Sequence, residues 1–255
     1  MFAPWQLPIL FATGLVAGFV DSIAGGGGLI TLPVLLSFGG NHALVFGTNK
    51  LQATCGSASA AWHYAKAGTV PVRGCTRIFF ITLAFSALGA LMLQVFALQR
   101  PDLLKKMVPM VLVLVALYAL LKPQLGFEDR SPRMARLTFD IIFGAVLGFY
   151  DGFFGPGVGT FWTIAFVTCL GFNLTRATGY TKVVNLASNV GALVLFLWRH
   201  NVDFAAGLTM GAGQILGARI GSKMVLKRGA KFIRPIFISV VIAVTLKLIW
   251  DAYAR

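Results

Sequence analysis

Two aspartates lie in stretches of the sequence that otherwise contain almost no charge. Asp21 and Asp151 each interrupt an apolar run, and a lysine follows each of them, Lys50 after the first and Lys182 after the second. A charge near the centre of a bilayer costs about 2.5–3.5 kcal/mol, so a position that recurs needs a reason. Each aspartate could cap a half-helix or pair with a lysine. Alternatively, Asp21 and Asp151 could be coupling residues that carry a proton or a cation.

Glycine clusters follow both aspartates. Gly25, Gly26 and Gly27 belong to a run of four glycines, and Gly155 and Gly157 flank a proline. Glycine and proline interrupt helices, and the N–H groups that start a new half-helix favour anions. We predict that both clusters line a substrate site at a helix break. The alternative is close helix packing through small residues.

Both lysines have small polar neighbours. A cation among hydrogen-bonding side chains suits a small oxyanion, although a lysine near a helix end can also extend to the membrane surface. The predicted polar partners of an anion are Asn49, Lys50, Gln52, Lys182 and Asn185.

The composition places these residues in a membrane protein. Of the 255 residues, 57% are hydrophobic and only 12% are charged, against about 25% charged residues in soluble domains. Uncharged stretches cover 1–20, 22–49, 78–99 and 152–175, and about 18 apolar residues suffice for a membrane-spanning helix. We therefore predict an all-α polytopic membrane protein.

About eight hydrophobic segments are expected. The first and the fifth are too long for one straight helix across a hydrocarbon core of about 30 Å, and glycine interrupts both, so broken or re-entrant helices are predicted there. The segments are 6–38, 43–65, 78–98, 103–121, 137–172, 176–198, 204–226 and 233–250.

The two halves of the chain resemble each other. The stretch around Asp21 aligns with that around Asp151, an offset of 130 residues (151 − 21), and three further matches follow in the same order. We predict a first membrane repeat at 1–122, a polar linker at 123–136 and a second repeat at 137–255. Repeated halves with matching interrupted segments are typical of secondary transporters. The repeats could be parallel or inverted.

Other functions have less support. The net charge of +14 comes from lysines and arginines in short loops such as 100–106, 130–136 and 223–234, where they suit anionic lipid head groups better than nucleic acid. The sequence contains no nucleophile, metal-binding or nucleotide-binding motif, so we expect no enzyme activity, no metal and no cofactor.

The motifs resemble those of the TauE/SafE family of anion transporters, and within it the YfcA-like branch. The first resemblance runs from Gly18 to Ile30 and then from Gly47 to Gln52, and the second runs from Gly148 to Gly157. The resemblance covers essentially the whole chain. It implies a multi-pass permease of the bacterial inner membrane for sulfite or organosulfonates.

We therefore expect a secondary transporter for a small anion that binds at mid-membrane between the two repeats. A coupling proton or sodium ion and a homodimer are possible partners. The alternatives are a passive anion channel, a membrane scaffold that transports nothing, and an enzyme acting on a lipid-linked substrate.

Overall fold

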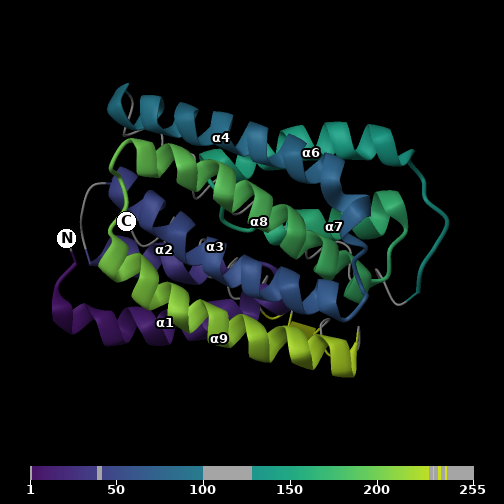
Figure 1. Cartoon of the computed structure of the whole chain (residues 1–255), viewed down its shortest axis with the longest axis horizontal. Coiled ribbons are helices and arrows are strands. Elements are labelled where there is room, and N and C mark those ends of the chain that lie inside the picture. Colours follow the sequence, from purple (N-terminus) through teal and green to yellow (C-terminus); the bar gives the residue numbers. More distant parts are fainter. Residues whose placement is uncertain are drawn as a thin grey trace.

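The computed structural model describes residues 2–38, 42–99 and 128–229, together with Phe232, Pro235, Ile236 and Ser239. Within these residues the regular structure is entirely helical (Figure 1). The α-helices are α1 (Leu7–Ala24), α2 (Gly27–Ser37), α3 (His42–Lys66), α4 (Thr76–Gln99), α6 (Arg136–Phe153), α7 (Val158–Leu170), α8 (Leu174–Trp198) and α9 (Phe204–Arg228). Two short 3-10 helices, Pro4–Gln6 and Val72–Cys75, precede α1 and α4.

The two long hydrophobic segments are broken, as predicted, and in each the chain turns back on itself. Trp5 before α1 contacts Phe38 after α2, with ring centroids 5.9 Å apart. Likewise, the N–H of Arg130, ahead of α6, donates to the Gly171 carbonyl after α7 at 2.7 Å. Each break is therefore a reversal. At 1.5 Å per residue, α2 and α7 are only about 17 and 20 Å long, too short to cross a bilayer.

The two halves run in opposite directions. In Figure 1, α1 starts at the left end of the bundle and α6 at the right end. The backbone N–H of Phe2 donates to Asp203 at the start of α9, and Arg136 at the start of α6 donates to the Gly74 carbonyl ahead of α4. The arrangement is thus that of inverted halves. Their common origin by duplication stays a prediction.

Two long helices form the centre of the bundle. Helices α3 and α8 pack against each other, α9 packs on α3, and α4 packs on α8. The outer pairs are α1 with α9 and α4 with α6, so each outer pair combines one helix from each half. Glycines of α9, such as Gly213 and Gly217, lie against the backbone of α1, as expected for close packing through small residues.

Apolar side chains cover the outside of the bundle, and polar ones fill its centre. Phe80 of α4 and Val146 of α6 are 62% and 60% exposed, whereas Thr48, Gln52 and other polar groups of α3 are buried. Among the described residues, three helical stretches are long and apolar enough to cross a membrane: Pro4–Ala24, Arg73–Phe96 and Leu174–Trp198. This inside-out distribution fits a lipid environment, as the composition predicts.

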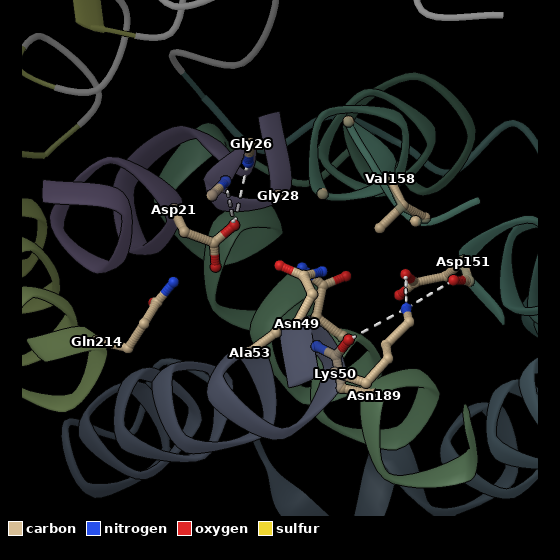
Figure 2. Close-up of a pocket in the computed structure, with 15 residues that line it drawn as sticks. Asp21, Gly26, Gly28, Asn49, Lys50, Ala53, Asp151, Val158, Asn189 and Gln214 are labelled. Atoms are coloured by element: carbon tan, nitrogen blue, oxygen red, sulfur yellow. Dashed lines mark hydrogen bonds and ion pairs between the residues drawn. The ribbon is translucent and has the colours of Figure 1, made fainter. Parts of the chain in front are cut away.

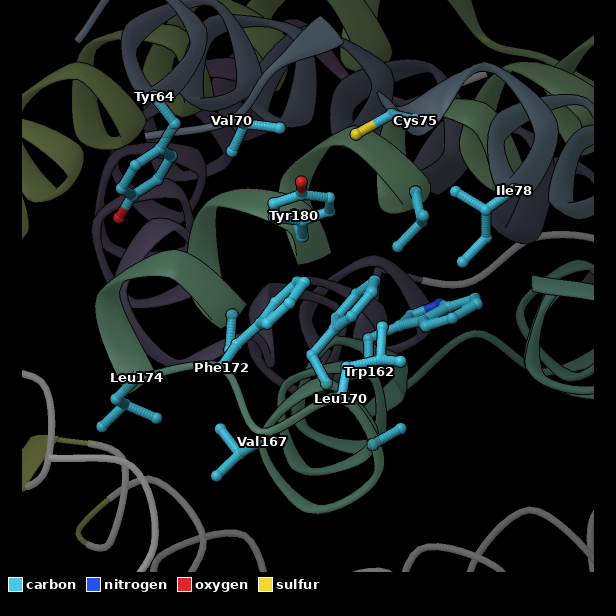
Figure 3. Packing of buried hydrophobic residues seen from close by; sticks show 14 of the residues in the cluster. Tyr64, Val70, Cys75, Ile78, Trp162, Val167, Leu170, Phe172, Leu174 and Tyr180 are labelled. Carbon is cyan, nitrogen blue, oxygen red and sulfur yellow. The ribbon is translucent and has the colours of Figure 1, made fainter. Parts of the chain in front are cut away.

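A hydrophobic cluster closes one end of the bundle (Figure 3). Tyr180 of α8 lies between Phe172 and the side chains around Cys75, and Trp162 of α7 is completely buried. The guanidinium of Arg176 stacks over the Phe172 ring, 4.1 Å from its centroid. The cluster fixes α7 against α8 and so holds the second break in place.

Six of the eight predicted segments match described helices. The segments 6–38 and 137–172 correspond to the reversing pairs α1–α2 and α6–α7. The segment 103–121 lies outside the described residues, as does nearly all of 233–250. Residues 128–135 of the predicted linker contain no helix, and α6 begins at Arg136.

Candidate functional site

Glycines with positive φ values form both helix breaks. Gly25 and Gly26 between α1 and α2 have φ values of 70° and 149°, and Gly155 and Gly157 between α6 and α7 have values of 85° and 78°. Residues other than glycine rarely adopt these backbone conformations. Because each chain reversal depends on such residues, the local sequence explains where the helices end.

The two breaks touch each other in the middle of the bundle. A Cβ atom on Gly25 would lie 2.5 Å from the carbonyl carbon of Gly159 in α7. The hydroxyl of Thr160 donates to the Gly25 carbonyl at 3.0 Å. The first turn of α7 therefore lies directly against the first break.

Each lysine forms an ion pair with the aspartate of the other half. The Nζ atom of Lys50 lies 2.6 Å from Oδ1 of Asp151, and Nζ of Lys182 lies 2.9 Å from Oδ2 of Asp21. Lys50 and Lys182 are only 2% and 0% exposed, so neither extends to the membrane surface. The pairs cross between the halves and join α3 to α6 and α8 to α1.

These pairs bring as much negative as positive charge into the centre. Buried ion pairs are stable only when further hydrogen bonds satisfy the charged groups. Oδ1 of Asp21 accepts the N–H groups of Gly26 and Gly27 at 3.0 and 3.1 Å, capping the start of α2. Asp151 accepts the hydroxyl of Ser188, and Lys50 also donates to the carbonyl of Asp151 at 2.6 Å. The aspartates thus act both as caps and as partners of the lysines.

Two asparagines on the cavity side of α3 and α8 use their amide oxygens in hydrogen bonds within the protein. Oδ1 of Asn49 accepts Thr31 Oγ1 at 2.6 Å and Gln52 Nε2 at 2.8 Å. Oδ1 of Asn189 accepts the Lys50 ammonium at 3.3 Å. Since both amide oxygens are engaged, the groups that these two residues leave for a ligand are N–H donors.

A small cavity lies between the breaks, the ion pairs and the asparagines (Figure 2). Its volume is about 40 Å³, and one water needs roughly 10–15 Å³ in such a cavity, so it can hold a few waters or one compact ion. Asn185 also faces it, and Oδ1 of this residue is buried without a hydrogen-bond partner among the described residues. The lining residues are Asp21, Gly26, Gly27, Gly28, Asn49, Lys50, Ala53, Asp151, Gly155, Gly157, Val158, Gly159, Asn185, Asn189 and Gln214.

Most of the residues predicted from the sequence line this cavity. Three do not: Gly25 contacts Gly159, Gln52 lies behind Asn49, and Lys182 lies behind Asp21. These three support lining residues instead. The predicted residues on the lining itself are Asp21, Gly26, Gly27, Asn49, Lys50, Asp151, Gly155, Gly157 and Asn185.

Six lining residues were not among those predicted: Gly28, Ala53, Val158, Gly159, Asn189 and Gln214. Ala53 and Val158 have apolar side chains that give no chemical signal, although Ala53 lies one helical turn after Asn49. Gln214 is the more informative omission. It is a single amide in a glycine-rich part of α9, outside the motifs from which the site was predicted, and only the packing of α9 on α1 and α3 brings it to the cavity.

A polar cavity at mid-bundle, between broken helices of inverted halves, is an arrangement found in many membrane transporters. Residues 10–248 match the family described as sulfite exporter TauE/SafE. The chain belongs to this family of membrane transporters, and the predicted resemblance is confirmed.

Three named relatives match the chain over most of its length. This chain is 43% identical over 255 residues to the protein named "Probable membrane transporter protein YfcA" of Escherichia coli, and the match covers 100% of this chain and 94% of that protein. A "Probable membrane transporter protein" of Haemophilus influenzae is 43% identical over 96% of this chain and 95% of its own length. "Probable membrane transporter protein YdhB" of Bacillus subtilis is 24% identical over 89% and 94%. No solved structure matches the chain.

Proposed function

We propose that this protein is a secondary transporter of a small oxyanion, with sulfite as the best candidate, and that the anion binds in the cavity between the two breaks. The observation that carries the proposal is that the amide oxygens of Asn49 and Asn189 are already occupied. The amide N–H groups of these two residues are therefore available to donate hydrogen bonds, which the oxygens of an oxyanion accept. The first turns of α2 and α7 line it through Gly28 and Gly159, and helix N-termini favour anions.

The size of the cavity favours a compact anion. A volume of about 40 Å³ suits sulfite, which has four heavy atoms, better than an organosulfonate, whose organic part would require the cavity to widen. The description of the family as sulfite exporters agrees with this chemistry. The inverted halves and the location at mid-bundle support alternating access, and the proposed location is the cell inner membrane.

A coupling ion follows from the charge balance. Two lysines and two aspartates leave the site without net charge when all four are ionised, so a bound anion needs a compensating cation. We assign this role to a proton or a sodium ion at an aspartate. Asp21 suits it better, because its side chain is 22% exposed, against 3% for Asp151, and a cation from the cavity can reach it.

Flux into proteoliposomes tests the proposal. At mildly alkaline pH, where sulfite does not cross lipid as a neutral gas, labelled sulfite should enter with saturation and show counterflow, because a carrier site is occupied once per cycle. Thiosulfate, taurine and acetate, added as competitors, should inhibit less than unlabelled sulfite. Protein-free liposomes are the control. A conductance without counterflow would favour the passive channel, and sulfite flux equal to that of empty liposomes would contradict the proposal.

A further inference from the structure

Gln214 of α9 is a buried amide whose side chain has no partner. It is 3% exposed and lines the cavity. In the part of the chain that the structure describes, no hydrogen bond or ion pair reaches this side chain. We propose that Gln214 is a substrate-binding and specificity-determining residue whose Nε2 donates a hydrogen bond to the bound anion, an inference that rests on the proposed function.

Two glycines make room for this side chain. A Cβ atom on Gly18 of α1 would lie 2.9 Å from Oε1 of Gln214, and one on Gly56 of α3 would overlap the same oxygen. The amide oxygen therefore lies between α1 and α3. Figure 2 shows the nitrogen end of Gln214 pointing toward Asp21 and the cavity. Any larger residue at either glycine would push the amide out of place.

The other buried glutamines show how unusual this arrangement is. Nε2 of Gln52 donates to Asn49 at 2.8 Å, Nε2 of Gln94 donates to the Ala90 carbonyl at 3.2 Å, and Oε1 of Gln6 accepts the Ala3 N–H at 2.9 Å. A buried amide without partners costs about 1–3 kcal/mol. An anion in the cavity would supply the missing acceptor.

Among the described residues, the corresponding position of the opposite half offers no such donor. Gly148 of α6 lies against the backbone of Thr82 in α4, much as Gly18 lies against the backbone of Gln214. The threonine side chain is shorter and is not part of the cavity lining. The two halves therefore offer the anion different groups, and Gln214 supplies a neutral donor on the α9 side only.

Sulfite uptake by variants at position 214 tests this role. Gln214→Met keeps the length and volume of the side chain but removes the donor, and Gln214→Glu adds a carboxylate that repels the anion. Gln94→Met is the matched control, because Gln94 is also 3% exposed but is not part of the cavity lining. We expect the KM for sulfite to rise about tenfold or more in Gln214→Met, the size of one hydrogen bond to a charged group, and further in Gln214→Glu. Gln94→Met should keep the wild-type KM.

The outcomes separate this inference from the proposed function. A folded Gln214→Met protein with the wild-type KM would overturn the inference while leaving sulfite transport intact. If Gln214→Met does not fold, the test rests on Gln214→Glu. An unchanged KM for sulfite in that variant would also overturn the inference. A fall in kcat alone, with KM unchanged, would indicate a structural role and overturn the inference. Wild-type protein without any sulfite uptake would instead contradict the proposed function, and the inference with it.

Discussion

The double substitution Lys50→Met with Asp151→Asn is expected to abolish sulfite transport while the protein stays folded. Lys50→Met alone would leave the Asp151 carboxylate buried without its cation, which costs about 3–5 kcal/mol. Replacing both members by neutral groups of similar volume avoids most of that cost. The double variant therefore separates the stability of the ion pair from its role at the cavity, which both residues line. Thermal unfolding of the purified protein and flux in proteoliposomes are the two measurements.

An exposed ion pair provides the control for this prediction. Arg176 and Asp129 lie 3.5 Å apart with side chains that are 39% and 50% exposed, and such pairs contribute about 0–1 kcal/mol. The variant Asp129→Asn removes this pair while Arg176 keeps its place over the Phe172 ring, and it should keep wild-type flux. Wild-type flux in the Lys50→Met, Asp151→Asn variant would show that the anion does not bind in this cavity.

Gly25→Ala is expected to have the second large effect. Its φ of 70° costs about 1–3 kcal/mol for a residue with a side chain. The new methyl group would also lie 2.5 Å from the Gly159 carbonyl carbon, and such overpacking adds about 1–3 kcal/mol. The two breaks would have to separate, so both the unfolding temperature and the sulfite flux should fall.

Gly68→Ala isolates the backbone contribution. Gly68 has nearly the same φ, 72°, but no atom lies within 4 Å of its added Cβ. It should cost only the backbone contribution of about 1–3 kcal/mol and leave transport unchanged. Equal losses of stability in the two variants would show that the contact between the two breaks does not contribute to the stability of the protein.

Local chemistry explains why much of the fold could be predicted. Adjacent glycines, and glycines beside a proline, weaken a helix more than single spaced glycines do, so the breaks after Asp21 and Asp151 could be predicted from the sequence. The burial of Lys50 was one of two alternatives, because a lysine near a helix end can also extend to the membrane surface. The reversal at each break depends on which helices the half-helix can pack against, so the sequence left both repeat directions open.

The rest of the site depends on contacts between the halves. Periodicity places Asp151 and Lys50 each on a helix, but only the packing of both helices on α8 decides that they pair across the halves. The position of Gln214 could not be predicted from its neighbours in the sequence, because two glycines on other helices create the space for its side chain. The predicted segment 103–121 lies outside the described residues and stays a prediction, as does a homodimer.

Filling the cavity tests the central claim most directly. Ala53→Leu adds three carbon atoms to a residue that lines the cavity, whereas Ala58→Leu makes the same change on the same helix at a residue that does not. Both alanines are partly buried. Equilibrium binding of labelled sulfite to the purified proteins should show one site per chain in the wild type and in Ala58→Leu, and none in a folded Ala53→Leu protein. Undiminished binding by Ala53→Leu would contradict the account, because the anion would then bind somewhere other than between the two breaks.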